Sequence, residues 1–573
     1  MRSFPALLLL CLLTAACRTT GPAPVLGPAG QTACSDARSI DEAFQCARRD
    51  PNALRELVLA MPKGGDLHHH LTGAIYPEVL IQLASYQGLC VDLSPDGSGN
   101  PKFAFQNCST PPAGQPAAGD IPLAALTADC KACPASQSAA CTGSVFVPAC
   151  CLCSSTALYD GTVNALSMRG VPWGTLQAHD HFFAIFGKLG PATGNKAALM
   201  AQLRQQASRE NVLYIETMSS VPYLANDPSW KAFQELFAAG NDSAGAAFCR
   251  QLEAGPTEPD ETGRKVLAAG EAVAKRVTEA MAAEIADSSR LLGCDTKPDA
   301  PGCEVTVGRQ IETHRTSSLV NICQEALLGF ASSQADRQHI VGINIVAAED
   351  AYVARVDYSA HMNLIGNLGR IYPLAGRALH AGELIEGLVP PNDLRFHIGD
   401  AVRVAGANRI GHGVAITYET RSGDLLREMA AKPVAVEINL VSNAQLLGVE
   451  GAEHPLPLYV ERGVPVVLAT DDPGIMRTSL TEQFRLAAQD YPRFRYADLR
   501  TFNRNSLEYS FLTGASIWED PGAYRHPVAD CRAALGGLDL DRCAKWAEGQ
   551  GDKARVQALL ERRLRAFEER YQP

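Results

Sequence analysis

Short apolar runs alternate with longer amphipathic stretches along most of this chain. We count eight strand candidates, which span residues 62–70, 212–218, 305–312, 340–346, 376–381, 409–413, 434–440 and 464–470. Between the strands, apolar residues recur at helical spacing, most clearly over residues 263–292, 318–333 and 554–571. Strands that alternate with helices build parallel sheets, so eight such units predict an α/β fold, a (β/α)8 TIM barrel.

Residues 90–155 interrupt this pattern after the first predicted strand. The stretch is rich in Gly, Pro, Ser and Thr, and it contains eight cysteines: Cys90, Cys108, Cys130, Cys133, Cys141, Cys150, Cys151 and Cys153. This composition predicts a disulfide-stapled insertion with little core of its own, tethered to the barrel as an autonomous module. A zinc knuckle at Cys130-x-x-Cys133 is the alternative. It is disfavoured because the compartment to which the chain is expected to be exported favours oxidation of cysteines.

The first 17 residues predict export. They combine a basic residue, an apolar run over residues 6–13 and small residues that end at Cys17. This is typical of a signal peptide, and residues 14–17 resemble a bacterial lipobox, whose cysteine is lipidated. The protein is therefore predicted to be a periplasmic or cell-surface lipoprotein with residues 18–35 as a flexible tether. Ordinary cleavage, which gives a secreted protein, is the alternative.

Export also predicts that the cysteines pair. Three pairs outside the insertion have the spacing of local disulfides: Cys34 with Cys46, Cys294 with Cys303, and Cys531 with Cys543. The remaining segments are assigned to the barrel, which begins in residues 36–89 and continues over 156–520, and to a C-terminal extension at residues 521–573.

Composition narrows the choice of partners. The 573 residues include 51 Lys and Arg against 62 Asp and Glu, a net charge of −11, and the basic residues are scattered. The sequence thus predicts no nucleic-acid partner and no membrane contact beyond the lipid anchor. A homodimer is left open.

Polar residues stand where several predicted strands end, and barrels carry their active sites at those ends. They are His68 and His70 on the first strand, His380 with Glu383 after the fifth, His412 on the sixth, and Asp471 with Asp472 after the eighth. Residues two apart on a strand face the same way, so the first two histidines both point into the barrel mouth, and His69 points outward. Taken alone, this histidine triplet could be a polar loop. Imidazoles and carboxylates that converge in one mouth instead predict a divalent cation. His397 and His454 lie near strand or turn boundaries and are interpreted as structural.

Four motifs in this order, LHHHL, HAGE, RIGHG and TDDP, resemble those of the adenosine deaminase family of zinc-dependent, amidohydrolase-like barrels. Residues 341–350 and 436–443 also resemble the family's fourth-strand and seventh-strand segments, so the likeness covers about residues 61 to 515. The export signal and the long insertion are most similar to the secreted branch, the adenosine deaminase-related growth factors.

The resemblance implies a role for each matching residue. His68, His70, His380 and Asp471 would hold one Zn²⁺ per chain, and Asp471 would thereby belong to the catalytic group. The metal would activate a water molecule for attack at C6 of the purine. Further roles are implied for three side chains and one backbone group: Glu383 gives a proton to N1, His412 orients the water or accepts its proton, Asp472 bonds N7, and the backbone N–H near Ala347 meets N3.

Three departures from the family pattern concern the substrate. Thr72 stands where many members have an acidic residue that contacts the ribose, Ala347 replaces a glycine, and Asn439 replaces a cysteine. The purine nucleosides adenosine and 2′-deoxyadenosine, deaminated to inosine and 2′-deoxyinosine, are the expected substrates. A modified adenine nucleoside is the nearest alternative. A deaminase-like binding or signalling protein, whose cysteine-rich module recognises a partner, is the alternative from another functional class.

Overall fold

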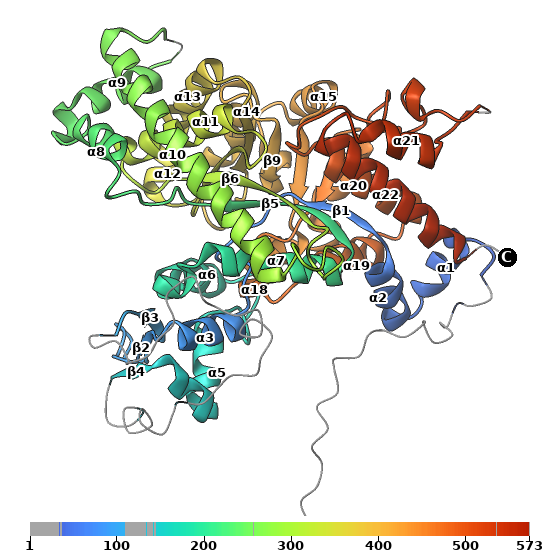
Figure 1. Cartoon of the computed structure of the whole chain (residues 1–573), viewed down its shortest axis with the longest axis horizontal. Helices are drawn as coiled ribbons and strands as arrows, with labels where there is room; N and C mark the ends of the chain where they lie inside the picture. Colours follow the sequence, from blue (N-terminus) through green and yellow to red (C-terminus); the bar gives the residue numbers. More distant parts are fainter. Residues whose placement is uncertain are drawn as a thin grey trace, which may run out of the picture.

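Eight parallel strands form the centre of this computed structural model, in the order β1-β5-β6-β7-β8-β9-β10-β11 (Figure 1). They are β1 (Lys63–Asp66), β5 (Val212–Ser219), β6 (Thr306–His314), β7 (Ile340–Val346), β8 (Gly376–Ala381), β9 (Arg409–His412), β10 (Ala435–Ile438) and β11 (Val466–Leu468). Each overlaps one of the eight strands expected from the apolar runs, which confirms the (β/α)8 barrel.

The structure describes residues 34, 37–108, 133, 141, 145–255, 257–534 and 536–571. The signal peptide expected at residues 1–17 lies outside the described residues, as does nearly all of the tether expected at 18–35. Within the described part of the chain, no helix combines the length and the apolar character needed to cross a bilayer.

The barrel closes between its first and last strands at their carboxyl ends. There His69 and Asp471 form a parallel bridge. The backbone N–H of Asp471 donates to the carbonyl of His68 at 2.9 Å, and the N–H of His70 donates to the carbonyl of Asp471 at 3.1 Å. Closure therefore places two segments about 400 residues apart in sequence side by side, and both carry candidate metal ligands.

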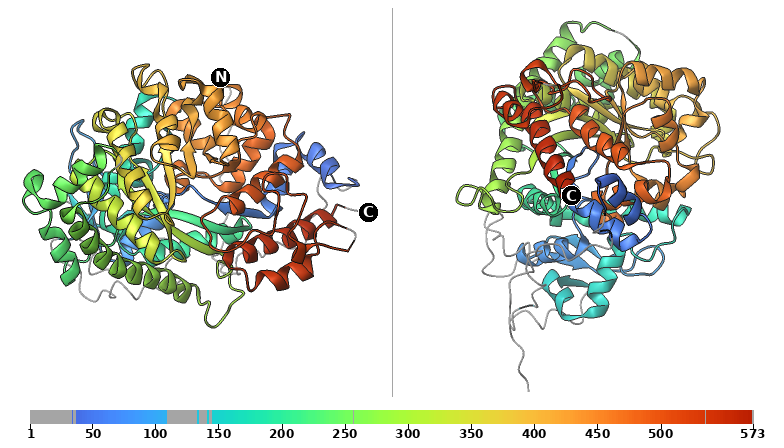
Figure 2. Two further views of the ribbon diagram at one scale, coloured as in Figure 1. Left: turned by 90° about the horizontal axis from the view of Figure 1, so that it is seen from above. Right: turned by 90° about the vertical axis from the view of Figure 1, so that its right-hand side faces the viewer.

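Helices surround the strands and form the outer layer (Figure 2). The helices after the insertion that accompany the barrel strands are α7 (Lys196–Arg209), α10 (Glu261–Leu292), α11 (Leu319–Ala335), α13 (Tyr358–Ile371), α14 (His397–Arg403), α15 (Ser422–Ala431), α16 (Leu440–Leu447), α17 (Leu456–Glu461), α19 (Leu480–Asp490) and α20 (Tyr496–Glu508). Their ends follow local chemistry. Helix α10 begins where Asp260 accepts a hydrogen bond from the N–H of Gly263, and it ends at Gly293, which adopts a left-handed conformation.

The other helices lie near the ends of the chain, on either side of the insertion and in the loops. They are α1 (Ile40–Ala47), α2 (Pro51–Ala60), α3 (Pro77–Tyr86), α5 (Thr156–Ala165), α6 (Leu176–Leu189), α8 (Pro228–Glu235), α9 (Ala244–Glu253), α12 (Tyr352–Val356), α18 (Pro473–Met476), α21 (Leu540–Ala547) and α22 (Asp552–Glu569). Helices α10, α11 and α22 correspond to the three helices expected most clearly from the sequence.

The cysteine-rich insertion contains a small antiparallel sheet. Strands β2 (Cys90–Asp92), β3 (Ala104–Gln106) and β4 (Phe146–Pro148) pair in the order β3-β2-β4, beside α3 and α5 (Figure 1). Among the described residues of the insertion, three disulfides join its cysteines: Cys90–Cys108, Cys133–Cys150 and Cys141–Cys151. These disulfides hold together an insertion that has too few apolar residues to form a core of its own.

The insertion is less independent of the barrel than its composition suggests. Its buried residues Val91, Phe105, Val147 and Leu152 belong to the same hydrophobic cluster as the barrel helices and strands. Strand β3 also contacts α6, which leads back into the barrel. The expectation of a tethered, autonomous module is therefore wrong in this respect, because these few apolar side chains are buried only by packing against the barrel.

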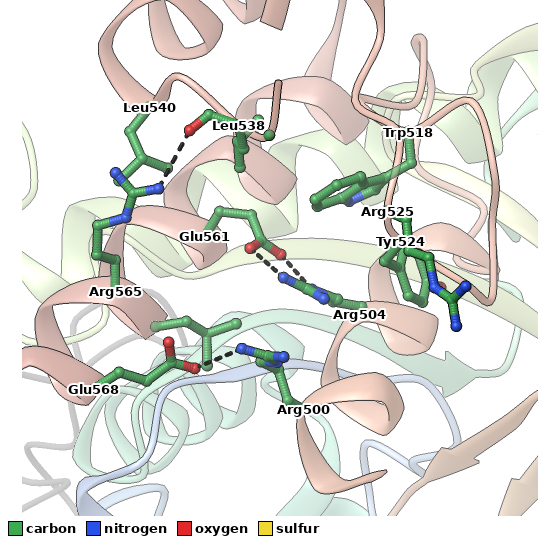
Figure 3. Close-up of a pocket in the computed structure, with 12 residues that line it drawn as sticks. Arg500, Arg504, Trp518, Tyr524, Arg525, Leu538, Leu540, Glu561, Arg565 and Glu568 are labelled. Atoms are coloured by element: carbon green, nitrogen blue, oxygen red, sulfur yellow. Dashed lines mark hydrogen bonds and ion pairs between the residues drawn. The ribbon is translucent and has the colours of Figure 1, made fainter. Parts of the chain in front are cut away.

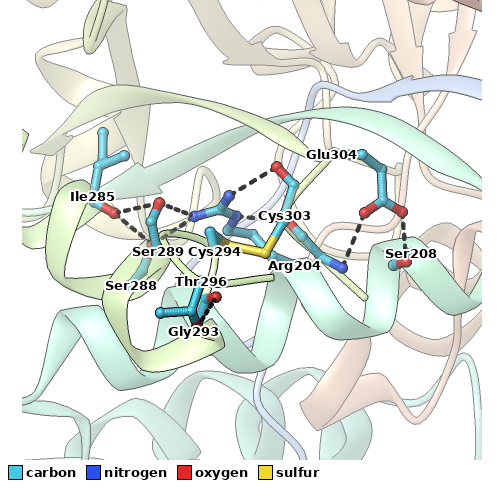
Figure 4. Close-up of a disulfide and its surroundings, with 11 residues drawn as sticks. Arg204, Ser208, Ile285, Ser288, Ser289, Gly293, Cys294, Thr296, Cys303 and Glu304 are labelled. Atoms are coloured by element: carbon cyan, nitrogen blue, oxygen red, sulfur yellow. Dashed lines mark hydrogen bonds between the residues drawn. A yellow bond between two sulfur atoms is a disulfide. The ribbon is translucent and has the colours of Figure 1, made fainter. Parts of the chain in front are cut away.

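Disulfides also staple the rest of the chain. The three local pairs expected from spacing are present: Cys34–Cys46, Cys294–Cys303 and Cys531–Cys543. Beside the second of these, the buried Arg204 donates to Ser289 Oγ at 2.7 Å and to the carbonyl of Gly302 at 3.0 Å, which anchors the loop that leads into β6 (Figure 4). A fourth disulfide, Cys249–Cys323, joins α9 to α11 and was not expected, because its cysteines are 74 residues apart.

The C-terminal extension packs on the barrel through ion pairs around a cavity of about 220 Å³ (Figure 3). Arg504 on α20 forms two hydrogen bonds of 2.7 Å to the carboxylate of Glu561 on α22. Its guanidinium also lies 5.0 Å from the ring centroid of Trp518. Arg500 pairs with Glu568 at 3.1 Å. These paired charges tie the extension to helix α20.

Glu561→Gln is expected to lower the free energy of unfolding by about 1–3 kcal/mol, because the largely buried guanidinium of Arg504 loses its charged partner. Urea unfolding followed by circular dichroism measures the change. Glu519→Gln is the matched control, since its pair with Arg532 is exposed and should contribute almost nothing. Equal losses in the two variants would show that the pair does not anchor the extension.

Candidate functional site

The four side chains expected to hold a metal lie together at the carboxyl ends of the strands. One donor atom from each of His68, His70, His380 and Asp471 lies within 4.8 Å of all the others. Oδ1 of Asp471 is 3.5 Å from Nε2 of His68 and 3.4 Å from Nε2 of His70, and the Nε2 atoms of His70 and His380 are 3.3 Å apart. His69 faces the other way, toward β5.

The chemistry of these donors fits a divalent cation. Nε2 of His68 is buried and has no hydrogen-bond partner among the described residues, although a buried polar atom needs one. Two imidazole nitrogens 3.3 Å apart likewise need a shared proton or a shared cation. Three imidazoles and one carboxylate form a donor set that suits borderline divalent metals.

Each of the three imidazoles is oriented by a polar side chain at its other ring nitrogen. Nδ1 of His68 lies 2.7 Å from Glu437 Oε2, Nδ1 of His70 lies 3.5 Å from Glu312 Oε1, and Nδ1 of His380 lies 2.8 Å from Asn344 Oδ1. These contacts direct all three Nε2 atoms toward one point, as partners of metal-binding histidines do. The sequence analysis did not identify these orienting residues. Their only signal is a polar residue inside an apolar strand.

A buried charge network supports the first histidine. Arg409 donates hydrogen bonds to both Glu437 and Glu216, and all three side chains are fully buried. Burial raises the pKa of Glu437, but Arg409 and His68 outweigh this effect and hold the pKa below its usual value. Burial lowers the pKa of His68, but the nearby carboxylates of Asp471 and Glu437 outweigh it and raise this pKa to about 9. The negative potential at His68 would equally stabilise a bound cation.

Glu383 and His412 lie beside the four candidate ligands. Oε1 of Glu383 is 3.3 Å from Nδ1 of His412, and donor atoms of both lie within 4.8 Å of a donor atom of Asp471. Burial and the charge of Asp471 raise the pKa of Glu383 well above its usual value. Burial lowers the pKa of His412 to about 3. Both shifts favour the uncharged forms, a protonated carboxyl group next to a neutral imidazole.

A second carboxylate, Glu349, fixes the turn that carries Glu383. It accepts hydrogen bonds from the backbone N–H groups of Gly382 at 3.0 Å and of Glu383 at 2.8 Å. Oε1 of the same carboxylate lies 2.6 Å from Nδ1 of His397 and 3.7 Å from Nη1 of Arg315. The side chain of Glu349 is fully buried, so this arrangement sets the backbone at residues 382–383. The residue stands in a motif that the sequence analysis noted, but its role could not be inferred there.

The three residues assigned to substrate binding differ in their surroundings. Asp472 is buried against Gly73, where an added Cβ would lie 1.5 Å from Asp472 Oδ1. That oxygen has no hydrogen-bond partner among the described residues, and burial raises the pKa of the carboxyl group well above its usual value. Ala347 directly follows β7 and is half-buried. Thr72 is also half-buried, two residues beyond His70, and within the described chain it makes no hydrogen bond to the site.

Three site residues hold the backbone in a conformation that favours glycine. The φ angles are +78° at Ala347, +65° at His412 and +65° at Asp471, at or within three residues of the ends of three barrel strands. This conformation costs a residue with a Cβ on the order of 1–2 kcal/mol. Such strain concentrates at functional sites, where the position of a side chain matters more than local stability.

Comparisons with known proteins place this geometry in context. Residues 271–516 match the family model described as adenosine deaminase. This segment includes His380, Glu383, His412 and Asp471, whereas His68 lies outside it.

Two relatives show how far the likeness extends. An adenine deaminase of Rhizobium leguminosarum bv. trifolii is 30% identical over 192 residues, which are 33% of this chain and 54% of that protein. An adenosine deaminase of Shigella boydii is 30% identical over 208 residues, which are 36% of this chain and 55% of that protein. The chain spans about half the length of the curated relatives it matches.

Solved structures resemble the chain over most of its length at low identity. An amidohydrolase from Burkhoderia ambifaria with bound Zn has a TM-score of 0.46 and 15% identity, and the match covers 89% of this chain and 94% of that chain. The N6-methyl-AMP deaminase of Arabidopsis thaliana has a TM-score of 0.44 and 14% identity, with coverages of 80% and 94%. Likenesses this distant do not indicate a substrate.

Proposed function

Because this chain belongs to the adenosine deaminase family, we propose that it is a zinc-dependent hydrolase that converts adenosine or 2′-deoxyadenosine to inosine or 2′-deoxyinosine and ammonia. The observation that carries the proposal is the convergence of His68, His70, His380 and Asp471 within 4.8 Å, with Glu383 and His412 beside them. This arrangement combines a metal site with an acid group and a neutral imidazole, as hydrolytic deamination requires.

Zinc is the metal we propose, at one ion per chain. Three imidazoles and one carboxylate match the nitrogen and oxygen donors that zinc takes in catalytic sites. When bound, the ion would lower the pKa of a coordinated water, so that a nucleophile is available near neutral pH.

Glu383 is the proton donor to purine N1 in this proposal. Attack at C6 places negative charge on N1, so a protonated carboxyl group at that atom stabilises the transition state. The raised pKa of Glu383 favours the protonated carboxyl group, because burial and the charge of Asp471 disfavour its ionised form. Glu349 supports this role by fixing the backbone of the same turn.

Asp472 and the backbone at Ala347 would hold the purine. Oδ1 of Asp472 is buried without a partner, and N7 of the base would supply one. The two acceptors can bond only if one carries a proton, and burial favours the protonated form of Asp472. The N–H near Ala347 would donate to N3. These contacts recognise adenine and leave the sugar to other residues.

We also propose that the protein works outside the cytoplasm. The disulfides in the insertion, between α9 and α11 and in the C-terminal extension support this, because such bonds persist in oxidising compartments. The relation to the secreted growth-factor branch and the lipid anchor remain part of the proposal.

A substrate panel tests the proposed specificity. Ammonia release is measured with adenosine, 2′-deoxyadenosine, N6-methyladenosine and adenine, and kcat/KM is compared between them. The two unmodified nucleosides should be the best substrates. Free adenine is the second candidate, because one of the relatives is an adenine deaminase. A clear preference for adenine or the methylated nucleoside would contradict the proposal.

A further inference from the structure

A chain of hydrogen bonds leads from the backbone of α17 to the ring of His412. It begins at the N–H of Leu456, which donates to Nδ1 of His454 at 3.0 Å. A backbone N–H can only donate, so Nδ1 of His454 carries a lone pair. His454 is buried, and burial lowers its pKa to about 3, so its ring is neutral. The single ring proton of His454 is therefore on Nε2.

That proton fixes the amide of Asn443 on α16. Nε2 of His454 lies 3.0 Å from Oδ1 of Asn443, and only an acceptor is favourable there. The amide nitrogen of Asn443 therefore faces the other way, where it lies 3.0 Å from Nδ1 of His412. Because the amide nitrogen donates, Nδ1 of His412 must accept. The proton of the neutral His412 ring is left on Nε2.

We propose that His454 and Asn443 are positioning residues that hold His412 as its Nε2–H tautomer, so that His412 serves the reaction as a hydrogen-bond donor and not as a proton acceptor. The role in the reaction rests on the proposed deaminase function, whereas the tautomer follows from the bonds through Leu456, His454 and Asn443. It also requires the amide of Asn439, whose nitrogen lies 3.4 Å from Nε2 of His412, to turn so that its buried, unpartnered Oδ1 faces that atom. Of the two roles implied for His412 by family resemblance, orienting the water is the one that this tautomer supports.

The contact between His412 and Glu383 agrees with this tautomer. Nδ1 of His412 is 3.3 Å from Oε1 of Glu383. An Nδ1 that carries a lone pair repels an ionised carboxylate at this distance, so the tautomer disfavours the charged form of Glu383. The same tautomer thus favours the protonated Glu383 that the proposed transfer to N1 needs.

The alternative role of His454 is only to cap the first turn of α17, by accepting a hydrogen bond from the N–H of Leu456. Asn443→Asp separates the two readings. The aspartate can only accept, so it would draw the ring proton of His412 to Nδ1 while it still accepts from His454. The cap of α17 would stay intact. Ser442→Ala is the matched control, since Ser442 is equally buried on α16 and its hydroxyl has no partner among the described residues.

Nitrogen NMR of the full-length, metal-loaded protein with ¹⁵N-labelled histidine reads the tautomer directly. The signals of His412 are identified by their loss in His412→Gln. The wild type and Ser442→Ala should carry the proton on Nε2, and Asn443→Asp should carry it on Nδ1. A wild-type proton on Nδ1, or an unchanged tautomer in a folded Asn443→Asp, would overturn the proposal. The wild-type spectrum alone tests the tautomer of His412, even if the Asn443→Asp variant does not fold.

Kinetics test the consequence for the reaction. Asn443→Asp should lower kcat by about tenfold or more with KM changed by less than about threefold, the scale of losses when an orienting partner is altered. His454→Gln, which can still donate to Asn443, should retain more activity than His454→Phe. Equal losses in these two His454 variants would contradict the positioning role. If the wild type has the expected tautomer but releases no ammonia from any substrate, the proposed function fails and the tautomer stands.

Discussion

Replacing His68 or Asp471 with alanine is expected to remove both the bound metal and the activity. Each residue supplies one of four converging donors, and the remaining three would leave a buried site with incomplete coordination. Elemental analysis of the purified wild type should find about one zinc per chain, as a tetradentate site implies. Both variants should contain far less metal at equal protein concentration.

His526→Ala is the control for these two variants. Its side chain is exposed and pairs with Asp520 in the C-terminal extension, so metal content and activity should not change. Elemental analysis that found no divalent metal in an active preparation, never exposed to a chelator, would contradict the metal assignment.

Replacing Glu383 with glutamine is expected to lower kcat by roughly 10²-fold or more, the usual scale for a general acid. The amide cannot give a proton to N1, yet it has nearly the same shape as the carboxyl group. Metal content and KM should stay close to wild-type values, because Glu383 is not among the four candidate ligands. Steady-state kinetics and elemental analysis on the same preparation separate the two effects.

The neighbouring Glu386 provides the matched control. It lies in the same loop but is exposed, so Glu386→Gln should behave as the wild type. Turnover close to normal in Glu383→Gln would mean that another group supplies the proton.

The barrel could be predicted from sequence because its physical signal is local. Most of the strands are short apolar runs that are buried on both faces, although β1 has the sequence KGGD, and polar residues mark several of the strand ends. The alternation of side chains along a strand was enough to place His68 and His70 on one side and His69 on the other. Convergence of the strand ends then follows from the barrel itself.

The residues that orient the site could not be predicted, because their contacts depend on closure of the barrel. Glu437 meets His68 across 369 residues of sequence, and Asn344 meets His380 from the adjacent strand. No local pattern distinguishes these polar residues from others inside a strand. The same holds for Cys249–Cys323, where only the packing of α9 on α11 brings the sulfurs together.

The insertion shows a different limit of sequence reasoning. Its composition correctly indicated a stapled structure with few apolar residues, but composition does not say what covers those residues. Val91 and Phe105 are buried in the cluster that the barrel also uses. A segment too small to form its own core is expected to bury its apolar side chains against a neighbouring domain.

Product analysis with adenosine tests most directly whether this barrel is the proposed metal-dependent adenine nucleoside deaminase. The metal-loaded protein should release ammonia and inosine in equal amounts. A chelator should abolish both products, and added zinc should restore them. A folded protein that contains its metal but forms no ammonia from adenosine or 2′-deoxyadenosine would contradict the account.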